Sequence, residues 1–192
     1  MKRQIFAVLL FTALFGNIFM SCDRKEIIVT SDLSGGIGEL SIDDIWEIED
    51  SFTLVNEMGY YLSEKCDFGD NTKCLSDAER TVYVVYTLEC EVNNGGFAQY
   101  FFNSSGNLGN ELCAAFEKIG ATKNAEICAK ATAVFGDNYP TDRSKRQDIM
   151  MADENVHFGD IWSECDNEFF GYPEDTSDMM YNFIIDNKKD FT

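Results

Sequence analysis

The sequence predicts an all-α fold, a single compact bundle of about six to eight helices, and three observations support this prediction. Apolar residues recur every third or fourth position in several stretches, which is the period of an α-helix. Residues that cap helices precede these stretches, and glycines follow two of them. The alternation typical of strands, and the two-residue signals typical of hairpins, are absent from the sequence.

The first element, residues 1–21, reads as a lipoprotein signal peptide and not as part of the fold. Lys2 and Arg3 give it a positive start, and the apolar stretch that follows is shorter than the roughly 20 residues of a membrane-spanning helix. It ends in Phe19-Met20-Ser21-Cys22, which resembles a bacterial lipobox, although Leu is more usual than Phe at the first position. A plain secreted protein is the alternative interpretation.

Acylation of Cys22 would anchor the protein to a membrane through lipid. We therefore predict a lipid-anchored protein of the bacterial cell envelope, on the periplasmic side or at the cell surface. Residues 22–40 are polar and contain Gly35-Gly36-Ile37-Gly38, so they are predicted to form a flexible tether. Residues 41–192 are predicted to form one α-helical domain.

The first helix of that domain is predicted to begin at Ser41, whose side chain can cap it together with Asp44. Acidic residues crowd the first turns, where the helix dipole favours them. Apolar residues then recur at helical spacing, which predicts one continuous buried face: Ile45, Ile48, Phe52, Val55, Met58 and Leu62.

The next element begins at the capping box formed by Ser76 and Glu79. The stretch from Thr81 to Thr87 is β-branched and aromatic, so its propensity alone favours a strand. The capping box, and the lack of turn residues before Asn93, favour a helix instead. A helix that is apolar on nearly every side would be the buried central helix of the bundle.

Five further helices are predicted downstream. Two are expected to end at Gly120 and Gly136, because glycine readily adopts the left-handed conformation that follows a helix. Asp142 can cap a short charged helix that runs to Met151. A helix is predicted around residues 161–169, and a last one over 178–186 with Ser177 as its cap.

Six cysteines follow Cys22, and an even number in an exported chain suggests disulfides. If an antiparallel helical pair turns near Gly120, the thiols of Cys113 and Cys128 lie level with each other. Cys66 and Cys74 bracket a short polar loop, which leaves Cys90 and Cys165 to pair. The candidate pairs are therefore Cys113–Cys128, Cys66–Cys74 and Cys90–Cys165. Six buried free thiols that pack as small hydrophobic groups are the alternative.

The most distinctive stretch runs from Glu91 to Gly106 and combines amides, glycines and aromatic residues. Its glycines can form a corner between two helices, because glycine and asparagine tolerate left-handed conformations. Its amides are expected either to cap helix ends and bridge neighbouring helices or to form a polar recognition patch beside exposed aromatic rings. The candidate residues of this motif are Asn93, Asn94, Gly95, Gly96, Phe97, Gln99, Tyr100 and Asn103.

This stretch resembles the signature of the bacterial DNA-mimic protein family, a domain of unknown function. Agreement continues at Ile119-Gly120-Ala121, at Arg143 with Arg146-Gln147, and at Glu168-Phe169-Phe170. The resemblance covers roughly residues 43–192 and implies an α-helical fold and a non-catalytic activity, in which an acidic surface imitates duplex DNA. A chain exported as a lipoprotein would not meet a cytoplasmic regulator, so the DNA-mimic partner is not carried over.

The charge also limits the function. The chain has 34 acidic residues against 15 Lys and Arg, a formal charge of −19 that becomes −21 when Lys2 and Arg3 are removed with the signal peptide. Such a charge disfavours direct binding to nucleic acid and favours a basic protein partner. We therefore predict a non-enzymatic acidic binding module tethered to the envelope, such as an inhibitor or an immunity protein, with no cofactor. Its oligomeric state is left open.

Two other functions stay open at this point. One is a metal-assisted enzyme that uses the amide motif with Glu89 or Glu91, and the other is a structural envelope lipoprotein. No catalytic residue, cofactor-binding residue or metal ligand is predicted. The lone histidine, His157, has no evident nucleophile partner, and the carboxylates at positions 43–50 lack the ligand order of a calcium loop.

Overall fold

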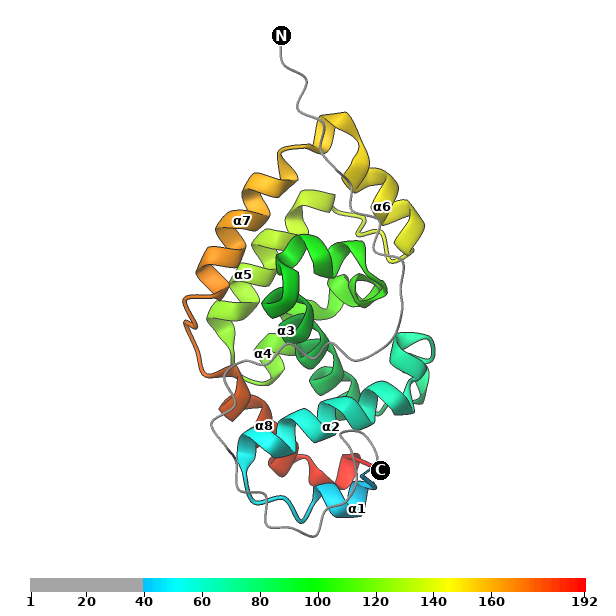
Figure 1. Cartoon of the computed structure of the whole chain (residues 1–192), viewed down its shortest axis with the longest axis vertical. Coiled ribbons are helices and arrows are strands. Elements are labelled where there is room, and N and C mark those ends of the chain that lie inside the picture. Colours follow the sequence, from blue (N-terminus) through cyan, green and yellow to red (C-terminus); the bar gives the residue numbers. More distant parts are fainter. Residues whose placement is uncertain (1–39) are drawn as a thin grey trace. The chain divides into compact units, whose positions relative to one another are not determined.

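The computed structural model describes residues 40–192. These residues contain eight α-helices and no strands, and the helices belong to one compact unit. The predicted all-α fold is thus confirmed (Figure 1). The predicted signal peptide, Cys22 and nearly all of the predicted tether lie outside the described residues. The helices are α1 (Ile42–Ile45), α2 (Ser51–Lys65), α3 (Asp77–Phe102), α4 (Leu112–Lys118), α5 (Thr122–Thr132), α6 (Arg143–Met151), α7 (Phe158–Phe169) and α8 (Thr176–Asp186).

The central element is α3, which contacts α2, α4, α6, α7 and α8 (Figure 1). Its first turn carries the predicted capping box: the Glu79 amide donates to the Ser76 hydroxyl at 3.1 Å, and the Ser76 amide donates to the Glu79 carboxylate at 2.9 Å. The β-branched stretch that follows is helical, because its side chains are buried on almost every side by neighbouring helices. Tertiary burial outweighs strand propensity here, as predicted.

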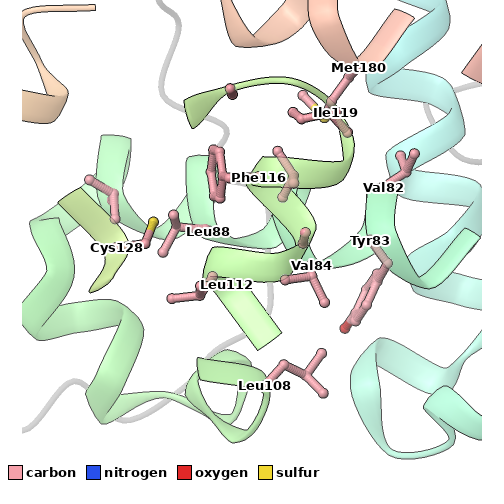
Figure 2. Packing of buried hydrophobic residues seen from close by; sticks show 14 of the residues in the cluster. Val82, Tyr83, Val84, Leu88, Leu108, Leu112, Phe116, Ile119, Cys128 and Met180 are labelled. Atoms are coloured by element: carbon pink, nitrogen blue, oxygen red, sulfur yellow. The ribbon is translucent and has the colours of Figure 1, made fainter. Parts of the chain in front are cut away.

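The core is continuous from α3 into the helical hairpin formed by α4 and α5. Figure 2 shows Leu88 of α3 beside Leu112 and Phe116 of α4 and Cys128 of α5, and all four are fully buried. Near the end of α3, Phe101 lies against Trp162 of α7, with their ring centroids 5.3 Å apart. The long α3 therefore joins an aliphatic part of the core to an aromatic part.

The predicted continuous helix from Ser41 to Leu62 is wrong. The Ser41 capping box forms as expected, but the helix that it begins ends at Ile45. A second N-cap, Asp50, accepts a hydrogen bond from the Thr53 amide at 2.8 Å and starts α2. Phe52 consequently faces solvent and is 61% exposed instead of buried. The apolar period continues across the break, so the period alone could not reveal it.

Most of the other predicted boundaries agree with the structure. Gly120 and Gly136 have φ values of 89° and 72°, the left-handed conformation expected after a helical segment. The Asp142 carboxylate caps α6 by accepting from the Lys145 amide at 2.9 Å. In α8, however, the cap is Asp175 and not Ser177, and the helix begins at Thr176. No helix among residues 40–192 combines the length and the hydropathy required to span a membrane.

The predicted disulfides are not formed, because all six cysteines described by the structure are free thiols. The thiol of Cys113 points to the Ala125 carbonyl, 3.5 Å from Sγ, which is one turn before Cys128 on α5. The thiols of Cys66 and Cys74 face the carbonyls of Ser63 and Lys65. Cys90 and Cys165 are also unpaired, so the alternative of free thiols applies to all three predicted pairs: Cys113–Cys128, Cys66–Cys74 and Cys90–Cys165.

Candidate functional site

The stretch from Glu91 to Gly106 forms a corner inside α3. Two glycines interrupt the helical backbone, Gly95 with φ −164° and Gly96 with φ 77° and ψ 178°. The conformation of Gly96 is one that only glycine adopts readily. The prediction of a helix-to-helix corner at this position is confirmed. The motif therefore divides α3 into two segments that run in different directions.

The second segment of α3 is capped by a residue from another helix. The Asp166 carboxylate of α7 accepts a hydrogen bond from the Phe97 amide at 2.8 Å. This amide is one of the donors that the interruption at Gly95 and Gly96 leaves without an intrahelical acceptor. Burial raises the pKa of Asp166, and the Phe97 hydrogen bond opposes that rise. Asp166 thus acts as the N-cap of a helix to which it does not belong.

Two amides of the motif, those of Gln99 and Asn103, converge on the carboxylate of Glu91. Gln99 Nε2 donates to it at 2.6 Å, and Asn103 Nδ2 lies 2.9 and 3.1 Å from its two oxygens. Ser105 Oγ donates to the same carboxylate at 2.7 Å. Asn94 joins the network indirectly, through a 3.2 Å hydrogen bond from its Nδ2 to Gln99 Oε1. Gln99 and Asn103, four residues apart, thus face the same carboxylate.

This network occupies the carboxylate almost completely. A carboxylate offers about four lone-pair positions, and here Gln99, Asn103 and Ser105 together approach it four times. Glu91 has no open position from which to act as a general base. The amides of Gln99 and Asn103 likewise bond to Glu91, and that of Asn94 bonds to Gln99. The geometry therefore supports the interpretation of this motif as a structural bridge.

Most of the aromatic residues between Glu91 and Gly106 are buried, and Phe102 is the exception at 37% exposed. Phe97, Tyr100 and Phe101 have no exposed surface, and Phe97 contacts Phe169 of α7 edge-on at a centroid distance of 5.9 Å. Of the exposed aromatic rings that a recognition patch would need, this corner presents Phe102 alone. Asn93, Asn94 and Gly95 are the exposed members of the motif, whereas Gly96 is buried.

The C-terminal end of α3 is held by a buried cation, Arg146 of α6. Its guanidinium has no exposed surface and donates to five neutral oxygens. These acceptors are the carbonyls of Phe101, Asn103, Pro140 and Thr141 and the side-chain oxygen of Asn107. A cation at the end of a helix is favoured by the helix dipole, while burial lowers the pKa of Arg146.

Two neighbours of Arg146 complete this end of the corner. Arg143 Nε and Gln147 Nε2 both donate to the Phe102 carbonyl, at 3.1 and 2.8 Å. The three residues stand at positions i, i+3 and i+4 and so share one face of α6. Their spacing in the sequence was the available signal for this role. Sequence reasoning noted these residues but did not assign them to the helix end.

Another polar contact lies next to the corner, where α3 meets the start of α8. Burial raises the pKa of Glu89 to about 7, with a hydrogen bond to the Thr176 side chain opposing the rise. The Thr176 hydroxyl also accepts from Asn124 Nδ2 of α5 at 2.7 Å. Glu89 thus takes part in a polar junction of three helices.

The described residues contain no group of three or more His, Cys, Asp or Glu side chains arranged to hold a metal ion. His157 is exposed, and its Nδ1 lies 3.1 Å from the Glu154 carbonyl at the start of α7. It therefore lies on the surface.

The family model described as DMP19-like protein matches residues 73–187. This range contains the whole corner, including Glu91, Arg146 and Asp166. The chain belongs to the DMP19-like family. Neither the curated proteins nor the solved structures provided a significant match.

Within the DMP19-like domain, Asp166 is the residue that sequence reasoning missed completely. Its role depends on α7 lying against the corner, and no local pattern announces that contact. Helix α2 and the turn after it precede the matched range, although α2 packs on α3 and α8 as part of the same unit.

Proposed function

We propose that the protein is a non-enzymatic acidic binding module that engages a basic protein surface. Its membership of the DMP19-like family, whose name stands for a DNA-mimic protein, is the observation that carries this proposal. The geometry of the Glu91 corner adds support, because the most distinctive residues of the chain are used to hold the fold together.

The distribution of charge supports the same function. Several exposed carboxylates take no part in the ion pairs of residues 40–192, which involve Asp77, Glu79, Glu111 and Glu168. Five of these unpaired acids lie on α7 and around the end of α2: Asp160, Glu164, Glu64, Asp67 and Asp70. Carboxylates without an internal partner leave their field available to an external cation.

The spacing of charge on α7 indicates how such a surface would imitate a polyanion. Asp160, Glu164 and Glu168 stand four residues apart, so their side chains follow one helix face at intervals of roughly 5–6 Å, and Glu168 at the end of the row is paired with Lys130. Duplex DNA carries about one charge per 1.7 Å of axis. A single helical row is therefore too sparse, and acids from several elements are needed to reach a comparable density.

The place of action follows from the predicted anchor. Acylation at Cys22 would hold the domain at the bacterial envelope, through a tether over residues 22–40, so the partner would be a basic protein that reaches that compartment. An inhibitor or immunity protein is the class that best fits an acidic binder in this location. Fatty-acid labelling of the wild-type chain and of Cys22→Ser tests the anchor: labelling is expected for the wild type alone.

The binding function is tested by capture with the full-length protein from envelope fractions. We expect a basic protein to be retained at about 50 mM salt and released at about 500 mM salt, since added ions screen exposed charges. Retention that does not depend on salt, or the absence of any captured protein at low salt, would contradict the proposal.

A further inference from the structure

Three aromatic residues outside the matched range lie along α2 and on the turn that follows it, η1 (Asp67–Gly69), with Phe52 roughly 12 Å from Tyr60 along the helix axis. Phe52 and Phe68 are 61% and 60% exposed. The ring of Phe68 contacts that of half-buried Tyr60 edge-on, with centroids 6.3 Å apart. Phe52 precedes Tyr60 by eight residues, or roughly two helical turns. We call Phe52, Tyr60 and Phe68 the α2 aromatic surface.

Phe68 is held in this exposed position at a conformational cost. Asp67 and Phe68 have φ values of 53° and 49°, in the left-handed region that non-glycine residues rarely adopt, and Gly69 follows with φ 100°. The turn is fixed at its base, because the amides of Gly69 and Asn71 both donate to the carbonyl of buried Cys66, at 3.2 and 2.9 Å. The ring is thus displayed by a well-anchored turn.

The turn cannot easily rotate inward. An added Cβ at Gly69 would lie 2.9 Å from the hydroxyl oxygen of Tyr83, a buried residue of α3. The backbone of the turn therefore already rests on the core. Packing against the core explains the position of Gly69 but not the outward position of the Phe68 ring.

Carboxylates neighbour Tyr60 and Phe68 in the chain. Glu64, Asp67 and Asp70 are exposed, and none of them takes part in an ion pair within the part of the chain that the structure describes. Aromatic faces beside carboxylates suit the guanidinium group, which stacks on a ring and can bind a carboxylate through two parallel hydrogen bonds. The lysine ammonium is a more strongly hydrated point charge and lacks this planar fork.

We propose that the α2 aromatic surface, with Glu64, Asp67 and Asp70, binds an arginine-bearing segment of the basic partner. This inference rests on the proposed function and names the chemistry of the partner. Because the surface precedes residues 73–187, it lies in a part of the chain to which the family match does not extend. The preference for arginine over lysine is what separates this inference from attraction by charge alone.

Calorimetric titration of the full-length protein with nona-arginine and with nona-lysine tests the inference. Both peptides carry the same charge, so the acidic field acts on both. We expect nona-arginine to bind more tightly, and the double variant Phe52→Ser/Phe68→Ser to weaken it about tenfold while changing nona-lysine by less than about twofold. The control is Phe170→Ser, which changes an exposed aromatic residue just after α7. This variant should bind both peptides like the wild type.

A second variant separates the loss of the Phe68 ring from a distortion of the turn. Phe68→Gly removes the ring but suits the left-handed backbone, so it should fold at least as stably as the wild type and still lose the preference for arginine. Equal affinity for the two peptides, or binding of nona-arginine that neither variant weakens, overturns the assignment of this surface and leaves the acidic binding function standing. Binding to neither peptide at low salt overturns both.

Discussion

The carboxylate of Asp166 on α7 accepts a hydrogen bond from the Phe97 amide of α3 at 2.8 Å, and the residue before Phe97 is a glycine, Gly96. A Cβ built at Gly96 would lie 2.4 Å from Asp166 Oδ2. The cap and the glycine therefore depend on each other, since any side chain at position 96 would displace the carboxylate that starts the next helical segment.

Removal of this cap should destabilise the corner. We expect Asp166→Ala to lower the free energy of unfolding by about 1–2 kcal/mol, the usual cost of losing an N-cap. Asp160→Ala, at an exposed position on the same helix, is the matched control and should change stability by less than about 0.5 kcal/mol. Urea denaturation followed by circular dichroism measures both. Equal effects of the two substitutions would show that the contact with Phe97 does not stabilise the fold.

A methyl group at Gly96 should be more harmful. Gly96→Ala combines a positive φ with a collision against Asp166, so we expect a loss of about 3 kcal/mol. Gly159→Ala is the control, because an added Cβ at Gly159 meets nothing within 4 Å and alanine favours the helix. It should be neutral or slightly stabilising. A Gly96→Ala protein as stable as the wild type would mean that the corner relaxes without cost.

The buried guanidinium of Arg146 leads to a third prediction. Arg146→Met would leave carbonyls at the end of α3 without their donor, and we expect a loss of about 3–5 kcal/mol in the free energy of unfolding. Arg146→Lys retains the charge but cannot reach all five acceptors, so it should recover only part of that loss. Thermal denaturation would rank the three proteins. Full recovery by lysine would show that charge alone, and not the fork of donors, holds this end.

The pKa of Glu89, raised to about 7 by burial, predicts a specific dependence of stability on pH. Between about pH 5 and about pH 8, the folded protein binds the Glu89 proton more tightly than the unfolded chain does. Stability therefore falls as pH rises through this range. We expect Glu89 to contribute about 2 kcal/mol to this fall.

Urea denaturation at the two pH values measures this contribution. Glu89→Gln should remove it, because the amide stays neutral throughout, whereas Glu126→Gln, at an exposed residue of α5, should leave it unchanged. The same decrease in stability in Glu89→Gln as in the wild type would assign the pH dependence to other groups.

The sequence predicted the helical class, the central helix and the corner because each has a local cause. The capping box at Ser76 and the two glycines at positions 95 and 96 act through their immediate neighbours. The break before α2 was missed, because Asp50 caps a new helix while the apolar period continues across it. The pairing of cysteines was wrong, because it required the rotation of each helix about its own axis. The cap by Asp166 could not be predicted, since it depends on the packing of α7 against α3.

The central claim separates the residues that hold the fold from those that bind the partner. The affinity of the full-length protein for the captured basic protein, measured by calorimetry at low salt in two variants, tests it most directly. Glu91→Gln should lower the free energy of unfolding by about 1–3 kcal/mol, because the amide cannot accept all four hydrogen bonds, and should leave the affinity unchanged. The variant with amides in place of Glu64, Asp67, Asp70, Asp160 and Glu164 should keep its stability and bind at least about tenfold more weakly. The opposite pattern, a stable Glu91→Gln protein that no longer binds beside a neutralised surface that binds normally, would contradict the account and place the interaction at the corner itself.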